Sequence, residues 1–135
     1  MNTVKSLISA RRAGNILIVS LSLLLVFHVL VLFRLAPAEI VWGGQAVNSP
    51  DELFILEGFG LFLTFIFLAI VSAKVGYINA NSFIKPINVF LWIIFVYLIL
   101  NFGSNLVSKT FAENVLFAPV TIIMAFLVYR LILES

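Results

Sequence analysis

The chain has 135 residues, of which 63% are hydrophobic and 10% are charged, and its net charge is +2. Roughly a quarter of the residues in an ordinary soluble domain are charged, and a soluble domain of this size could not bury so much apolar surface. The composition therefore excludes a soluble globular domain, a disordered chain and a nucleic-acid-binding protein. Because the chain has no cysteine, disulfides, thiol chemistry and cysteine-ligated metal centres are excluded as well.

Four apolar stretches are each about 20 residues long, the length that a membrane-spanning helix needs. In lipid, the backbone amides of a spanning segment must be satisfied within that segment, so helices are the expected structure. The sequence predicts an all-α protein, a transmembrane antiparallel four-helix bundle that forms a single domain over residues 1–135. The expected spans lie at about residues 16–34, 51–75, 87–108 and 111–133.

The first span follows three basic residues and carries one ionisable side chain, His28. The basic start, the apolar stretch and Ala36-Pro37-Ala38 together imitate a signal peptide with a cleavage site. The stretch is longer than the usual apolar core of about 7–15 residues, so we expect it to be retained. A single histidine on an apolar helix either hydrogen-bonds within the packing or has a functional role. Without a second histidine, a His-rich metal site is excluded.

The loop after the first span, roughly residues 35–49, is the longest connection and is unusually apolar. It contains Ile40-Val41-Trp42, followed by Gly43-Gly44, which permit a sharp bend. Trp42 is either a plain anchor at the membrane interface or part of a lid that lies on the membrane surface and closes over a ligand.

The second span begins with Ser49-Pro50-Asp51-Glu52, which is typical of a capping box with proline at the first helical position. Glu57 follows on the order of 10 Å from the helix start, and Thr64 shares its face. The Glu57 carboxylate either lies at headgroup level and is solvated, or lies inside the membrane, where an ionisable group indicates a function.

The third span carries polar side chains at spacings of three and four, so they share one face of a helix. These are Tyr97, Asn101, Ser104, Asn105 and Ser108. The stripe either hydrogen-bonds to neighbouring helices or lines a hydrated cavity. Gly103 and Ser104 are small enough to permit close helix approach, whereas two amides one turn apart exceed what packing alone requires.

A tight turn near residues 108–110 makes the third and fourth spans an antiparallel hairpin. Thr110-Phe111-Ala112-Glu113 is typical of a second capping box. Pro119 lies inside the fourth span, where it removes an amide donor. We therefore expect a kink that leaves the Val115 carbonyl in need of a partner.

Basic residues are distributed unevenly between the two sides of the predicted bundle, and the side richer in Lys and Arg is the cytoplasmic one. One side has Lys5, Arg11, Arg12, Lys74, Lys85 and Arg130, and the other has Arg34 and Lys109. Five of the six acidic residues belong to the poorer side. We therefore expect both termini in the cytoplasm.

The polar and ionisable side chains of the spans share one depth, in the outer half of the bilayer, while the inner half is nearly all apolar. This predicts a polar vestibule that opens outward and is closed toward the cytoplasm by Phe and Leu side chains. The candidate ligand-binding residues are His28, Trp42, Glu57, Tyr97, Asn101 and Asn105. Just above them, Lys109 can pair with Glu57 or with Glu113. No catalytic residue, metal or cofactor is expected.

The run from Pro37 to Gly44 (PAEIVWGG), Glu57 early in the second span, and the segment from Asn101 to Lys109 resemble a group of uncharacterised small bacterial four-span membrane proteins. The resemblance covers most of the chain. It implies a four-span fold in a bacterial inner membrane and brings no activity with it. In that group a glycine directly precedes the second asparagine, whereas Ser104 occupies that position here.

Two of the functions that these features allow use the vestibule. The first is the binding, or assisted transport, of a lipid-like or small polar ligand, with Glu57 providing charge, Asn101 and Asn105 hydrogen-bonding, and Trp42 closing over the ligand. The second is a membrane enzyme in which Glu57 and His28 act as an acid/base pair, which requires both groups to reach one reacting atom.

The third function is structural. The bundle would form a homo-oligomer or pack against a larger membrane complex, and the polar stripe would only join helices. Stripes of small residues at a spacing of four are typical helix-contact faces in membranes. The candidates are Ala69 with Ala73, Ser72 with Gly76, and the run of Ala118, Thr121 and Ala125. The expected partners are thus the lipid bilayer, a lipid or small molecule, and other membrane chains, but no nucleic acid.

Overall fold

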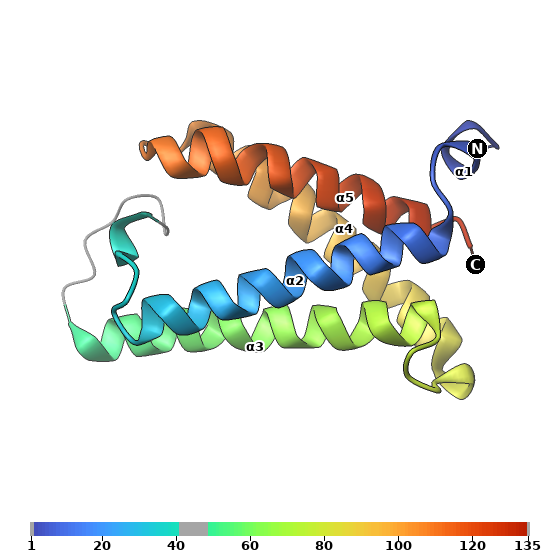
Figure 1. Ribbon diagram of the computed structural model, residues 1–135, viewed down its shortest axis with the longest axis horizontal. Coiled ribbons are helices and arrows are strands. Elements are labelled where there is room, and N and C mark those ends of the chain that lie inside the picture. Colours follow the sequence, from blue (N-terminus) through green and yellow to red (C-terminus); the bar gives the residue numbers. More distant parts are fainter. Residues whose placement is uncertain (1, 41–48, 135) are drawn as a thin grey trace.

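A computed structural model of the chain describes residues 2–40 and 49–134. These residues form helices and no strand. The elements are α1 (Asn2–Leu7), α2 (Ala10–Leu32), η1 (Ala38–Ile40), α3 (Pro50–Val75), η3 (Asn81–Phe83), α4 (Ile84–Val107), η4 (Ala112–Phe117) and α5 (Ala118–Ile132). Four helical segments are long and apolar enough to cross a membrane, so the all-α four-helix bundle predicted from the sequence is confirmed (Figure 1).

The helix boundaries follow from capping side chains. Ser49 accepts a hydrogen bond at its Oγ from the Glu52 N–H, 3.1 Å away, and Pro50 is the first residue of α3, as the capping box predicts. α3 ends because Gly76 adopts a left-handed conformation with φ 92°, which favours glycine. Nothing lies within 4 Å of a Cβ built on Gly76. Gly76 therefore ends the helix and packs against no described residue of its own chain.

α2 begins at Ala10, earlier than expected, because the Ser9 side chain caps it by accepting a hydrogen bond from the Arg12 N–H. The helix therefore includes Arg11 and Arg12. The six residues of α1 precede it, in place of a frayed terminus.

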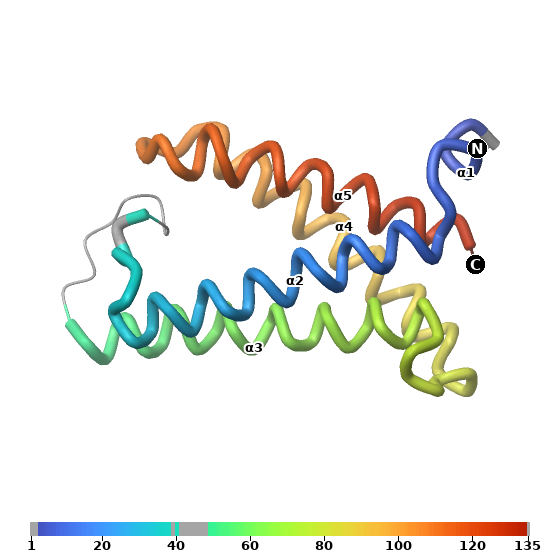
Figure 2. Tube along the Cα trace, in the orientation of Figure 1, coloured from blue at the N-terminus to red at the C-terminus, as the bar shows by residue number. Residues whose placement is uncertain are grey.

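The helices form two antiparallel pairs, α2 with α3 and α4 with α5 (Figures 1 and 2). The pairs converge at the end of the bundle that holds both termini and the α3–α4 connection, and they diverge toward the opposite end. We call these the terminal end and the open end.

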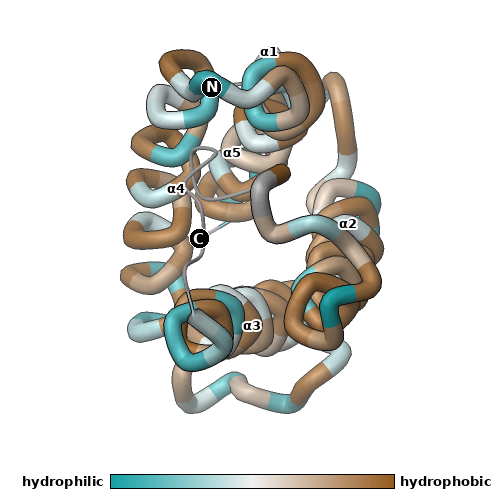
Figure 3. The backbone as a smooth tube through the Cα atoms, turned by 90° about the vertical axis from the view of Figure 1, so that its left-hand side faces the viewer, coloured by the Kyte–Doolittle hydropathy of each residue, from teal (hydrophilic) through white to brown (hydrophobic). Residues whose placement is uncertain are grey.

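The hydrophobic core lies at the terminal end, where all four long helices meet. It includes Ala13, Leu17, Val71, Leu91, Ile94, Val128 and Leu131. α2 and α3 are closest beside Gly14, where an added Cβ would lie 2.1 Å from the Val75 Cγ2 atom. Apolar residues predominate along the helices (Figure 3), and large exposed ones such as Leu23, Phe65 and Leu100 cover the outside. Such a surface suits lipid and not water.

Arg130 is buried near the terminal end, although we expected it simply to end the last span. Its Nε donates to the Ile8 carbonyl at 2.7 Å, and its Nη1 lies 2.7 Å from the Glu134 carboxylate. This hydrogen bond holds the pKa of Glu134 below its ordinary value. Arg130 thus ties the segment before α2 to the end of α5.

The small residues of α5 pack inside the bundle. Ala118, Thr121 and Ala125 are each exposed by 5% or less. This run therefore contacts helices of its own chain, and the prediction that it forms a contact face for a partner is wrong. Ala69 and Ala73 of α3, another predicted contact pair, are only half-buried by the rest of the chain.

Candidate functional site

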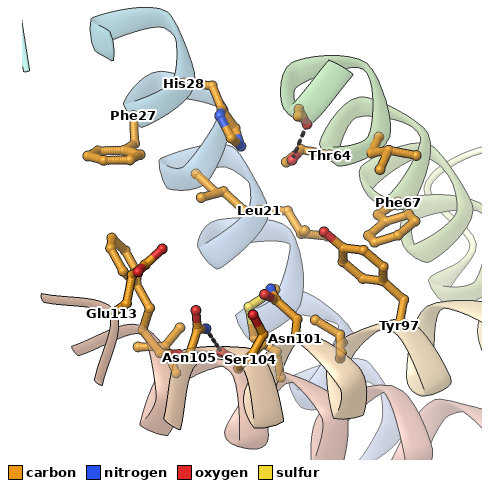
Figure 4. Close-up of a pocket in the computed structure, with 18 of the residues that line it drawn as sticks. Leu21, Phe27, His28, Thr64, Phe67, Tyr97, Asn101, Ser104, Asn105 and Glu113 are labelled. Carbon is orange, nitrogen blue, oxygen red and sulfur yellow. Dashed lines mark hydrogen bonds between the residues drawn. The ribbon is translucent and has the colours of Figure 1, made fainter. Parts of the chain in front are cut away.

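A cavity of about 520 Å³ lies between the two helix pairs (Figure 4). Ligand sites in proteins typically have volumes of about 300–1,000 Å³. Leu21, Leu98 and Met124 belong both to the cavity lining and to the hydrophobic core, so the core closes the cavity toward the terminal end. The polar groups that line it include His28, Tyr97, Asn101, Ser104, Asn105 and Glu113.

Two aromatic contacts bridge the helix pairs beside the cavity. Phe27 of α2 packs against Phe117 of η4, with ring centroids 5.9 Å apart. Phe67 of α3 packs edge-on against Tyr97 of α4 at 5.5 Å. All four rings line the cavity, so part of its wall is aromatic.

His28 and Glu57 meet between α2 and α3. The His28 Nδ1 lies 2.7 Å from a Glu57 carboxylate oxygen, and the side chains are 14% and 0% exposed respectively. Glu57 is therefore enclosed by protein, and the alternative of a solvated carboxylate at headgroup level is wrong. The His28 ring points into the cavity (Figure 4), whereas Glu57 is not among the described lining residues.

Gly60 makes this contact possible. A Cβ at residue 60 would lie 2.6 Å from the His28 Cε1 atom and 3.1 Å from both ring nitrogens. The ring therefore rests directly on the α3 backbone one turn after Glu57. Thr64 continues this face, with its hydroxyl donating to the Gly60 carbonyl at 2.8 Å.

The polar stripe of α4 divides into two parts. The amide of Asn105 is buried and donates at 3.0 Å to the Thr121 hydroxyl of α5, so it joins two helices. Asn105 also lines the cavity, together with Tyr97, Asn101 and Ser104. The Asn101 amide points into the cavity (Figure 4) and makes no hydrogen bond to any residue within 2–40 or 49–134. Asn105 therefore both joins two helices and lines the cavity, whereas the Asn101 amide only lines it.

Gly103, beside Ser104, has nothing within 4 Å of a built Cβ. No described residue packs against it, so the prediction that it permits close helix approach is wrong for the helices of this chain.

Glu113 lies on the cavity wall at the start of η4 and is 7% exposed. Its backbone N–H donates to the Thr110 hydroxyl at 3.3 Å, as the second capping box predicts. Its carboxylate accepts hydrogen bonds from the Ser108 hydroxyl and, at 2.8 Å, from the Thr110 hydroxyl. Among the described residues the ion pairs are His28–Glu57 and Arg130–Glu134, so the expected pairing of Lys109 with Glu57 or Glu113 does not form.

The backbone before Pro119 is a π-helical turn. The Ala118 N–H donates to the Glu113 carbonyl, five residues back. Such turns are rare and are frequent at functional sites. The sequence predicts an irregularity in this helix. The structure has it as a π-helical turn, η4, which contains Glu113.

The candidate residues are mostly brought together. His28, Tyr97, Asn101 and Asn105 line one cavity, and Glu57 lies behind His28. Trp42 lies outside the described residues. Glu113 and Thr121 also line the cavity, although the sequence analysis assigned them only to a cap and a contact face. Their spacing of eight residues, which repeats on one helix face, is a signal that could have found them.

No group of three or more His, Cys, Asp or Glu side chains that could hold a metal ion occurs in the part of the chain that the structure describes. Comparisons with protein-family models, with curated proteins and with solved structures gave no match.

Proposed function

We propose that the protein binds, or helps to transport, a lipid-like or small polar ligand in the cavity between the two helix pairs. The observation that carries the proposal is the Asn101 amide, which points into a cavity of about 520 Å³ without a hydrogen bond to any described residue. A polar group in a membrane bundle is costly, and such groups commonly mark a ligand pathway. A ligand with hydrogen-bonding groups and an apolar body matches the polar and aromatic wall.

The proposal includes an orientation. Both termini lie at one end of the bundle (Figure 1), and six of the eight Lys and Arg residues of the chain belong to that end. The positive-inside rule therefore supports cytoplasmic termini and a cavity on the outer side of the membrane. The resemblance noted in the sequence supports a bacterial inner membrane.

The first test uses 1-octanoylglycerol, an uncharged amphiphile with two free hydroxyls, as the probe. It should raise the melting temperature of the detergent-purified protein by several degrees at saturation, because a ligand that binds only the folded state stabilises it. Asn101→Leu should melt normally without the probe and lose this response. Asn15→Leu is the matched control, since Asn15 accepts a hydrogen bond from Tyr77 and does not line the cavity. An unchanged response in Asn101→Leu would contradict the proposal.

The second test measures whether the cavity is hydrated, using the fact that the native chain has no cysteine. In intact cells, Ser104→Cys should react with a membrane-impermeant maleimide, because its thiol faces the cavity and only a hydrated thiol forms the reactive thiolate. Gly103→Cys is at the same depth but points away from the helices. It should react at least about tenfold more slowly. Equal labelling rates for Ser104→Cys and Gly103→Cys would contradict a hydrated cavity beside residue 104.

The contact between His28 and Glu57 favours a second candidate, a membrane enzyme. When the Nδ1–H donates to the carboxylate 2.7 Å away, the other ring nitrogen carries the lone pair and can act as a general base, as in catalytic dyads. Chemical conversion of a bound amphiphile that is lost in His28→Gln, while binding persists, would favour the enzyme over the binding protein.

A further inference from the structure

We infer that the cavity accepts an organic cation, with an ammonium-type group attached to an apolar body. This inference rests on the proposed function and adds the chemical class of its ligand. Three features around one cavity carry the inference: the Glu113 carboxylate, the His28–Glu57 pair and several aromatic rings. The described lining residues include no lysine or arginine.

The first step is the charge of the cavity. Of the described lining residues, Glu113 carries a formal negative charge, and His28 is backed by the carboxylate of Glu57. Arg34 and Lys109, the basic residues near the open end, are both exposed and do not line the cavity. An anionic ligand such as a phosphate or carboxylate would therefore meet the Glu113 carboxylate and no lysine or arginine among the described lining residues.

The second step is the way in which Glu113 is held. The Ser108 and Thr110 hydroxyls both donate hydrogen bonds to its carboxylate. These bonds come from the turn between α4 and η4, so the carboxylate is fixed on the wall and is not a mobile surface group. Hydrogen bonds between a fixed carboxylate and an ammonium are among the stronger polar contacts in proteins.

The third step is what surrounds a cation in the cavity. The rings of Phe27, Phe67, Tyr97 and Phe117 line it, and the face of an aromatic ring attracts a cation, most strongly where water is excluded. On the α2 side, the His28 nitrogen that does not face Glu57 is a further acceptor when Nδ1–H donates to the carboxylate. The Asn101 carbonyl oxygen adds an acceptor on the α4 side. An alcohol could use the same acceptors, but its neutral hydroxyl gains less from the carboxylate charge than an ammonium group does.

The test uses three probes with one body and three charges: 1-adamantylammonium, 1-adamantanol and adamantane-1-carboxylate. Their affinities are measured by calorimetry on the full-length protein in an uncharged maltoside detergent. We expect the ammonium to bind at least about tenfold more tightly than the alcohol, because a charged hydrogen-bond partner contributes more than a neutral one. The carboxylate should bind more weakly than the alcohol.

Glu113→Gln removes the charge and keeps a carbonyl acceptor for the Ser108 and Thr110 hydroxyls. It should weaken ammonium binding about tenfold and weaken adamantanol binding by a smaller factor. Asp51→Asn is the matched control, since it removes the same charge from an exposed residue in the first turn of α3, outside the cavity lining. The three-probe comparison on the native protein stands by itself if Glu113→Gln does not fold.

Equal affinities for the ammonium and the alcohol would overturn the inference, and so would an unchanged ammonium affinity in Glu113→Gln. The proposed function is judged separately, by the response to 1-octanoylglycerol, so the two can fail independently. A last measurement asks where the ammonium group comes from. Displacement of 1-adamantylammonium by dihexanoyl phosphatidylethanolamine, but not by dihexanoyl phosphatidylglycerol, identifies a lipid headgroup. Absence of displacement by either lipid identifies a free amine.

Discussion

Replacing His28 with leucine should lower the free energy of unfolding by about 1–3 kcal/mol, the usual cost of taking a hydrogen-bond partner away from a buried polar group. The Glu57 carboxylate is 0% exposed and loses the ring nitrogen that lies 2.7 Å from it. An ordinary side-chain hydrogen bond between membrane helices contributes only about 0.6 kcal/mol on average. Equilibrium unfolding in mixed detergent micelles can distinguish these two magnitudes.

The double variant His28→Leu/Glu57→Leu provides the control for this experiment. It should regain most of the lost stability, because two apolar side chains of suitable volume can replace a buried pair. Asn101→Leu, whose amide makes no hydrogen bond to a described residue, should change the stability by less than the average helix–helix hydrogen bond. If the two single effects simply add in the double variant, the side chains do not interact, and the contact has no energetic meaning.

Most of the fold could be predicted from the sequence, because in a membrane the constraints on one helix act within that helix. Hydropathy and length determine the four spans, and the Ser49 cap and Pro50 mark a helix start as expected. The start of α2 was less predictable. A cap at Ser9 carries the helix through Arg11 and Arg12, which hydropathy alone excludes from a span.

Which faces meet could not be predicted, because that depends on how helices pack together. His28 and Glu57 are 29 residues apart in the chain, and no spacing rule links positions in different helices. The same limit applies to the stripe of α4. Asn101 and Asn105 share one face in the sequence, yet only Asn105 lies where Thr121 of α5 can accept its hydrogen bond.

For Glu113, the sequence predicts the backbone contact but not the position of the side chain in a cavity wall. The capping pattern correctly predicts the hydrogen bond from the Glu113 N–H to the Thr110 hydroxyl. That pattern gives no sign that the Glu113 side chain has a second role. The divergence of the helix pairs, which no local pattern reports, turns the same carboxylate into part of a cavity wall. A structural role and a candidate binding role thus coincide in one side chain.

Gly60→Ala is the second substitution with a large expected effect. The new methyl group would lie 2.6 Å from the His28 Cε1 atom, so the ring must turn away. Because the ring is held by Glu57 at 2.7 Å, turning it breaks that contact. We expect a loss of about 1–3 kcal/mol from overpacking, in addition to the weakening of the pair. Unfolding in mixed micelles measures the change.

Gly58, on the same helix, provides a matched control, because nothing lies within 4 Å of a Cβ built there. Gly58→Ala should leave stability unchanged or raise it by up to about 1 kcal/mol, since alanine favours a helix more than glycine does. In a His28→Ala background the ring is gone, so Gly60→Ala should then behave like Gly58→Ala. If Gly60→Ala remains costly in that background, the glycine is required by the α3 backbone itself and not by the histidine that rests on it.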